Sequence, residues 1–139
     1  MTIRKLIIFL QILILNLIIT GCLNTKAKNC QQIIKVTAQV ETNAKENLAS
    51  QNLDNILQVA DSFEIASQNI LQQKIKDKQL AELSKNLGKI YQEYALVTRN
   101  FITAFKNKDQ EQAIFYKDEV KRLFSQQQTL VNQINDYCQ

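Results

Sequence analysis

The sequence predicts an all-α protein: an antiparallel, up-down-up-down four-helix bundle that follows an N-terminal segment of a different kind. The 139 residues include no Pro and only two Gly, so the turns that an all-β fold needs are scarce. Four stretches carry apolar residues in steps of three and four, as in helices that pack at a shallow angle. The breaks between these stretches are short, which makes neighbouring helices antiparallel.

The first two helices are expected at about residues 30–49 and 53–73, and residues 50–52 between them offer side chains that can cap a helix. The apolar stripe of the first helix comprises Ile33, Thr37, Val40, Ala44 and Leu48, widened by Ile34 and Ala38. The stripe of the second helix comprises Leu53, Ile56, Leu57, Ala60, Phe63, Ser67, Ile70 and Leu71.

The third and fourth helices are expected at about residues 78–106 and 110–137, where the steps of three and four run without a break. Asp109 and Gln112 form a candidate capping box between them. The stripe of the third helix comprises Leu80, Leu83, Leu87, Ile90, Tyr94, Val97, Phe101 and Ala104. The stripe of the fourth helix comprises Ala113, Tyr116, Val120, Leu123, Gln127, Leu130, Ile134 and Tyr137.

Residues 1–22 have the features of an export signal. Arg4 and Lys5 precede a mostly apolar stretch at residues 6–20, which is closer to the ~7–15 residues of a signal peptide than to the ~20 of a membrane span. The stretch ends in Ile-Thr-Gly-Cys at residues 19–22, which resembles the bacterial lipobox. An ordinary secretory signal and an uncleaved N-terminal anchor are the alternatives.

The lipobox resemblance implies that the Cys22 sulfur receives diacylglycerol, that the chain is cleaved before Cys22, and that the new amino group is acylated. Residues 1–21 are then a lipoprotein signal peptide, 22–29 a lipidated linker and 30–139 the bundle. Two or more acyl chains hold a protein stably on a membrane. We therefore expect an exported, membrane-anchored protein in a bacterial envelope, on its periplasmic face, or in a thylakoid lumen, with membrane lipid as one partner.

Two cysteines remain besides Cys22, and the topology brings them together. Cys30 opens the first expected helix and Cys138 closes the fourth, and an even number of helices returns the chain to its starting end. Export implies an oxidising compartment, in which such a pair forms a disulfide. We predict a Cys30–Cys138 disulfide, with two free buried thiols as the alternative.

Two surfaces are candidates for contact with other molecules. At the disulfide end, near the lipid, a basic collar is expected, which would be attracted to anionic headgroups or would simply solvate the linker and loop. Beside the apolar seams lies a candidate contact patch of Phe105, Phe115 and Phe124. The collar comprises Lys26, Lys28, Lys35, Lys74, Lys76 and Lys78.

The composition speaks against several classes of function. Without His there is no Ser-His or Cys-His catalytic pair and no His-containing zinc site. Gly21 and Gly88 stand too far apart for a phosphate-binding loop, and the thirteen carboxylates are scattered among basic residues. The net charge is +4, and it decreases when Arg4 and Lys5 are removed. A positive charge this small gives little reason to expect nucleic-acid binding. We expect no enzyme, no cofactor, no metal and no nucleic-acid partner.

The chain from Cys22 onward resembles small helical exported proteins of cyanobacteria that have no known activity. The resemblance rests on residues 30–34 (CQQII), residues 98–101 (TRNF) and residues 135–139 (NDYCQ). In architecture it is similar to the lipid-anchored, four-helix PsbQ-like subunit of photosystem II. That similarity implies an accessory subunit of a photosynthetic membrane complex.

Three functions are therefore open at this point. The first is a membrane-tethered helical interaction module that binds a protein partner. The second is a binder of a small apolar ligand held between the helices. The third is the accessory subunit that the PsbQ-like architecture implies.

Overall fold

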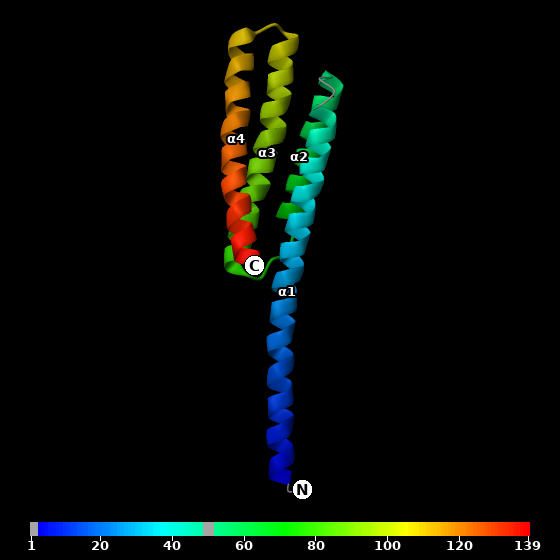
Figure 1. Ribbon diagram of the computed structural model, residues 1–139, viewed down its shortest axis with the longest axis vertical. Coiled ribbons are helices and arrows are strands. Elements are labelled where there is room, and N and C mark those ends of the chain that lie inside the picture. Colours follow the sequence, from blue (N-terminus) through cyan, green and yellow to red (C-terminus); the bar gives the residue numbers. More distant parts are fainter. Residues whose placement is uncertain (1–2, 49–51) are drawn as a thin grey trace.

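The computed structural model describes the backbone of residues 3–48 and 52–139 and the side chains of residues 25–47 and 52–139. The described backbone forms four helices, which run up, down, up and down and confirm the all-α bundle (Figure 1). The N-terminal part of α1 continues below the bundle as a single straight helix (Figure 1). The helices are α1 (Ile3–Leu48), α2 (Leu53–Leu71), α3 (Lys78–Lys106) and α4 (Gln110–Cys138).

The predicted start of the first helix is wrong. We expected a linker before Cys30, but α1 is already helical there, and Asn29 is buried against the bundle. The reason is that residues 23–29 contain neither Pro nor Gly, so nothing in the chain stops a helix that packing favours. The lipobox prediction at residues 19–22 lies outside the described side chains. Within residues 25–47 and 52–139, no helix has both the length and the apolar character that crossing a membrane requires.

The other helix boundaries follow local capping chemistry. Asn52, Asp77 and Asp109 each accept a hydrogen bond from a backbone N–H in the first turn of α2, α3 and α4, respectively. The Asp109 cap was expected, whereas the Asp77 cap was not. α3 ends in a Schellman motif: Lys108 has a positive φ of 58°, and Asp109 N–H donates to the Ala104 carbonyl over 2.9 Å.

The core is centred on α3, which packs against both α2 and α4. Tyr91 and Leu87 of α3 are fully buried, as is Leu123 of α4. The Phe63 ring of α2 stacks on Tyr94 with the ring centroids 4.5 Å apart, and it meets Tyr91 at a tilt. The predicted stripes therefore identify the core, although α3 buries a broader face than one seam because it has two neighbours.

Three predicted core positions are wrong. Ile34 and Ala38, which were expected to widen the stripe of the first helix, are exposed, and so is Leu71 at the end of α2. Ile34 and Ala38 lie 100° and 140° around α1 from the buried Ile33, which takes them off the core face. At the end of α2, Leu71 instead covers Gly88 of α3, where the two helices approach closely.

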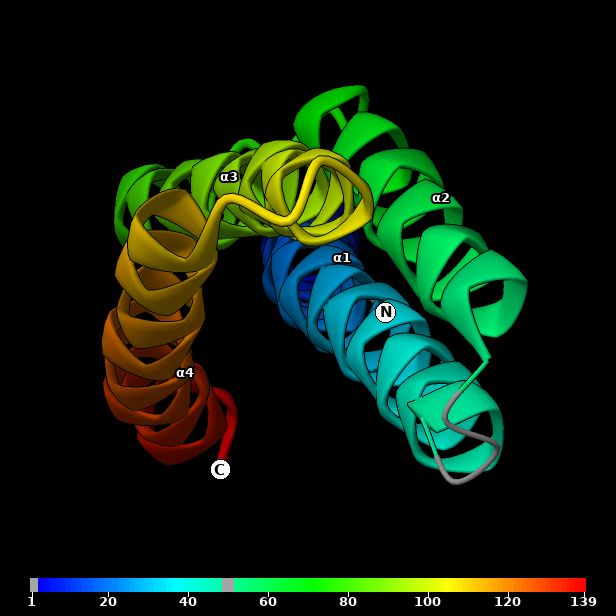
Figure 2. The same cartoon turned by 90° about the horizontal axis from the view of Figure 1, so that it is seen from above.

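The bundle is open along one edge. α2 contacts α3, and α3 contacts α4, along much of their length, whereas α1 and α4 touch at few positions. Seen from above, α1 and α4 lie apart on the side opposite α3 (Figure 2). We refer to this side of the bundle, between α1 and α4, as the open edge.

Candidate functional site

At one end of the bundle, a disulfide joins the two helices of the open edge. Cys30 of α1 and Cys138 of α4 are bonded, with their Cα atoms 5.9 Å apart, which confirms the predicted pairing. Cys30 is only 4% exposed, and Cys138 packs beside it with part of its surface accessible. We call this the disulfide end, and we call the opposite end, at the α3–α4 turn, the turn end.

A chain of polar contacts ties three elements together beside the disulfide. Lys26 Nζ of α1 lies 3.8 Å from the centre of the Tyr137 ring on α4. Tyr137 donates its hydroxyl to Asp77 Oδ2 over 2.8 Å, and Asp77 Oδ1 accepts the Leu80 N–H over 2.9 Å. The Leu80 amide and then the Tyr137 hydroxyl lower the pKa of Asp77, while the Asp77 carboxylate raises the pKa of Tyr137.

The predicted basic collar gathers at the disulfide end. Lys28 and Lys35 lie on α1 within five residues of Cys30, Lys74 and Lys76 lie on the α2–α3 loop, and Lys78 is the first residue of α3. The α2–α3 loop lies at the end of the bundle where α4 ends (Figure 1). These five side chains are exposed, and within the described residues none of them forms an ion pair. Lys26 differs, because it is half-buried against Tyr137. The arrangement can bring several cations to one anionic surface.

The three phenylalanines of the predicted contact patch do not share one surface. Phe105, Phe115 and Phe124 are 56%, 55% and 53% exposed. Phe115 and Phe124 are nine positions apart on α4, which places them on opposite sides of that helix. Phe105 and Phe115 both flank the α3–α4 turn, and Ile114, which precedes Phe115 in the chain and was not predicted, is 62% exposed. We call Phe105, Ile114 and Phe115 the turn-end surface.

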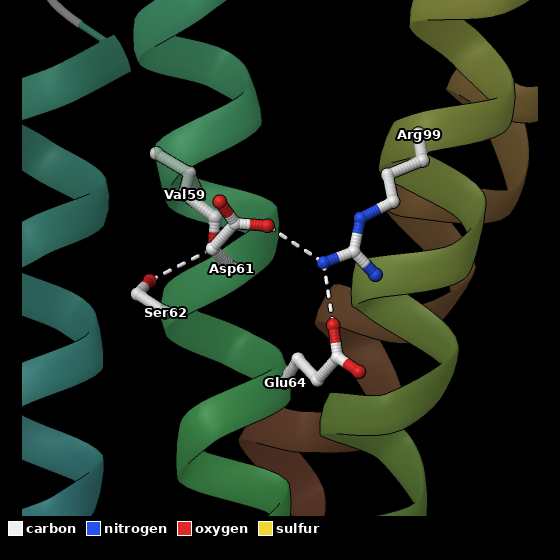
Figure 3. Close-up of polar contacts among 5 residues, drawn as sticks. All are labelled: Val59, Asp61, Ser62, Glu64 and Arg99. Atoms are coloured by element: carbon white, nitrogen blue, oxygen red, sulfur yellow. Dashed lines mark hydrogen bonds and ion pairs between the residues drawn. The ribbon is translucent and has the colours of Figure 1, made fainter.

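An ion-pair cluster between α2 and α3 was not anticipated. Figure 3 shows Arg99 of α3 reaching to two carboxylates of α2: one guanidinium nitrogen donates to Asp61 (2.7 Å) and to Glu64 (2.5 Å). These two contacts raise the pKa of Arg99. The partners are separated by more than thirty residues, so no local pattern could reveal the pairing. All three side chains are substantially exposed, and the cluster is best understood as a tie between two helices.

Polar groups at core positions have different kinds of partner. Ser67 of α2 donates its hydroxyl to the Gly88 carbonyl of α3 over 2.7 Å, a contact between helices that can fix their register. Thr37 of α1 donates to the Ile33 carbonyl of its own helix. Next to Thr37 lies the buried hydroxyl of Tyr91, whose pKa is raised by burial and partly lowered by the Thr37 hydroxyl.

Two open grooves lie along the bundle surface. One, of about 570 Å³, runs between α1 and α2 and includes Gln39, Asn43, Ile65 and Asn69 in its lining. The other, of about 770 Å³, lies between α3 and α4 near the disulfide end and includes Glu82 and the edge of Tyr137. Both are lined by a mixture of polar and apolar side chains. Within the described part of the chain, no three Cys, Asp or Glu side chains gather as a metal site would require.

Comparison with protein-family models, with curated protein sequences and with solved structures gives no match. The function is therefore inferred from the chemistry of the disulfide end and of the turn end of the bundle. The disulfide end combines a covalent link, a helix-to-helix polar chain and several exposed lysines. The turn end combines exposed apolar side chains with a rigid Schellman turn.

Proposed function

We propose that this protein is an exported, lipid-anchored, non-catalytic interaction module that stands on a membrane surface. One observation carries the proposal: the polar chain from Lys26 to Tyr137 and Asp77 fixes the bundle to the segment that directly follows Cys22. An anchor at Cys22 would then hold the bundle by its disulfide end. The turn-end surface would face away from the membrane.

The short distance between Cys22 and Lys26 supports this orientation. Leu23, Asn24 and Thr25 separate the two residues and belong to α1, so the rise between them is about 6 Å. A tether of that length restricts how far the bundle can change its orientation relative to the membrane. It also holds the collar lysines close to the headgroups, where each cation adds attraction to anionic lipid.

The turn-end surface is the candidate site for a protein partner. Phe105, Ile114 and Phe115 are large apolar side chains exposed on rigid helices, and aromatic side chains are enriched in protein interfaces. The resemblance of the sequence, in its expected architecture, to the PsbQ-like subunit would make a photosynthetic membrane complex one partner of suitable kind. Neither groove is an enclosed apolar cavity, so no observation favours the binding of a small apolar ligand.

Metabolic labelling with a fatty acid tests the anchor. Cys22→Ala should abolish incorporation of the label and prevent the loss of residues 1–21, whereas Cys30→Ala should leave both intact. Retention of the label and of the mature mass in the Cys22→Ala protein would contradict the anchoring proposal.

Site-directed photo-crosslinking in membranes tests the interaction surface. A photoreactive residue at position 115 should give one discrete crosslinked product, and the same residue at the exposed position 65, in the groove between α1 and α2, should not. The position-115 product should disappear when Phe105 is replaced by Ser. Equal crosslinking from both positions would contradict a partner at the turn end.

A further inference from the structure

We propose that the Cys30–Cys138 disulfide is a reducible latch on the open edge of the bundle. Thiol–disulfide exchange with a dithiol reductant opens it at Cys138. α1 is then released from α4, while α2, α3 and α4 stay packed. This inference concerns the redox chemistry of the disulfide, and it does not depend on the proposed anchor or partner.

The interactions that hold α1 to α4 are concentrated at the disulfide end. The disulfide and the Lys26 contact with the Tyr137 ring both lie there. Beyond that end the two helices make few contacts with each other. Reduction therefore removes the covalent part of an attachment that has little support along the rest of the open edge.

Among residues 25–47 and 52–139, the ion pairs between helices join α2, α3 and α4 and do not include α1. In the described part of the chain, they join α2 to α3 through Arg99, and α3 to α4 through Arg122 and Glu93. The ion pair of α1, between Lys45 and Glu41, lies within the helix itself. Contacts across α2, α3 and α4 therefore remain in place when the disulfide breaks.

Release of α1 from α4 has to overcome little packing between these two helices, but α1 also packs on α2. Ile33 and Val40 of α1 are buried in the core. When α1 moves away from α4 at the disulfide end, Ile33, which lies about one turn from Cys30, becomes accessible.

The accessibility of the two sulfurs sets the course of the exchange. Cys30 is almost fully buried, whereas Cys138 is partly exposed. A reductant thiolate attacks Cys138 Sγ, the S–S bond breaks, and the Cys30 sulfur leaves as a thiolate that takes up a proton. The second thiol of the reductant then attacks the mixed disulfide. Cys138 leaves as a thiol, and the two electrons that reduce the protein come from the reductant, which becomes a disulfide.

Hydrogen–deuterium exchange of the full chain in detergent tests the release of α1. Dithiothreitol should accelerate exchange in residues 30–47 by about tenfold or more, and exchange in residues 87–102 of α3 should change by less than about twofold. The Cys30→Ser, Cys138→Ser double variant should behave like the reduced protein and should not respond to dithiothreitol. Unchanged exchange in α1, or equal acceleration in α1 and α3, would overturn the latch.

Exchange with glutathione, a monothiol, tests which sulfur is attacked. Brief treatment followed by acid quenching and peptide mass analysis should place the glutathione adduct on Cys138. An adduct found mainly on Cys30 would overturn the proposed course of the exchange. Complete resistance of the folded protein to both reductants would overturn the latch itself.

Discussion

At Gly88, a single missing side chain lets α3 approach α2. A Cβ built there would lie 2.7 Å from Leu71 Cγ, and Ser67 bonds the Gly88 carbonyl beside it. Glycine costs a helix about 1 kcal/mol relative to alanine. Leu71 is half-exposed at the end of α2, so its side chain has room to move.

We therefore expect Gly88→Ala to have different effects in two backgrounds. In a Leu71→Ala protein the clash is absent, and Gly88→Ala should raise the free energy of unfolding by about 1 kcal/mol. In the natural protein the gain should be smaller, because Leu71 must shift. Urea unfolding of the four proteins measures the difference. Equal effects in both backgrounds would show that Leu71 does not restrict this position.

Asp77 makes the stability of the disulfide end depend on pH. Its pKa is lowered in the folded protein, so its contribution is complete above the unfolded value of 3.8 and is lost as the pH falls through the folded value. Asp77→Asn keeps an acceptor for the cap but does not titrate. The melting temperature of this variant should fall less than that of the natural protein as the pH is lowered below about 4. Parallel curves would contradict the role of Asp77.

The residues that sequence could identify are those whose chemistry is local or fixed by topology. Asp109 lies at a helix start, and the Cys30–Cys138 pair follows from the parity of the helices. Arg99 and Asp61 could not be paired, because their approach depends on the rotation of α2 against α3. The single patch predicted from Phe105, Phe115 and Phe124 was wrong in its geometry, because nine residues place Phe115 and Phe124 on opposite sides of α4.

Among the elements, α3 and α4 were predictable because apolar residues recur in steps of three and four along their whole length. The Asp109 cap also marked the start of α4, whereas the Asp77 cap of α3 was found only in the structure. The start of α1 in the structure was missed because residues 23–29 carry no stop signal and no strong apolar stripe. Its contact with the bundle, through Asn29 and Lys26, depends on where α4 ends.

The α3–α4 turn offers a test of its geometry. Lys108 adopts the left-handed conformation that the Schellman motif requires, which is unfavourable for a residue with a Cβ. Lys108→Gly should raise the free energy of unfolding by about 1 kcal/mol. The control Lys106→Gly, inside the last turn of α3, should lower it by a similar amount. Thermal unfolding followed by circular dichroism compares the two, and destabilisation by Lys108→Gly would contradict the turn.

At the scale of the whole molecule, the disulfide end and the turn end differ in chemistry and lie at opposite ends of the bundle. α4 alone is 29 residues long, so the turn end lies about 40 Å from the disulfide end. The topology of the bundle was predictable from helix number and loop length. Its open edge was not, because the divergence of α1 from α4 depends on how all four helices pack.

The central claim is that the bundle stands on the membrane by its disulfide end. Depth-dependent fluorescence quenching in anionic vesicles tests it most directly, with a fluorophore at position 76 on the α2–α3 loop or at position 108 on the α3–α4 turn, and a quencher attached to the lipid. We expect strong quenching at position 76, which weakens when Lys28 and Lys74 are replaced by Gln, and no quenching at position 108. Equal quenching at the two positions would show that the bundle lies flat on the membrane and would contradict the claim.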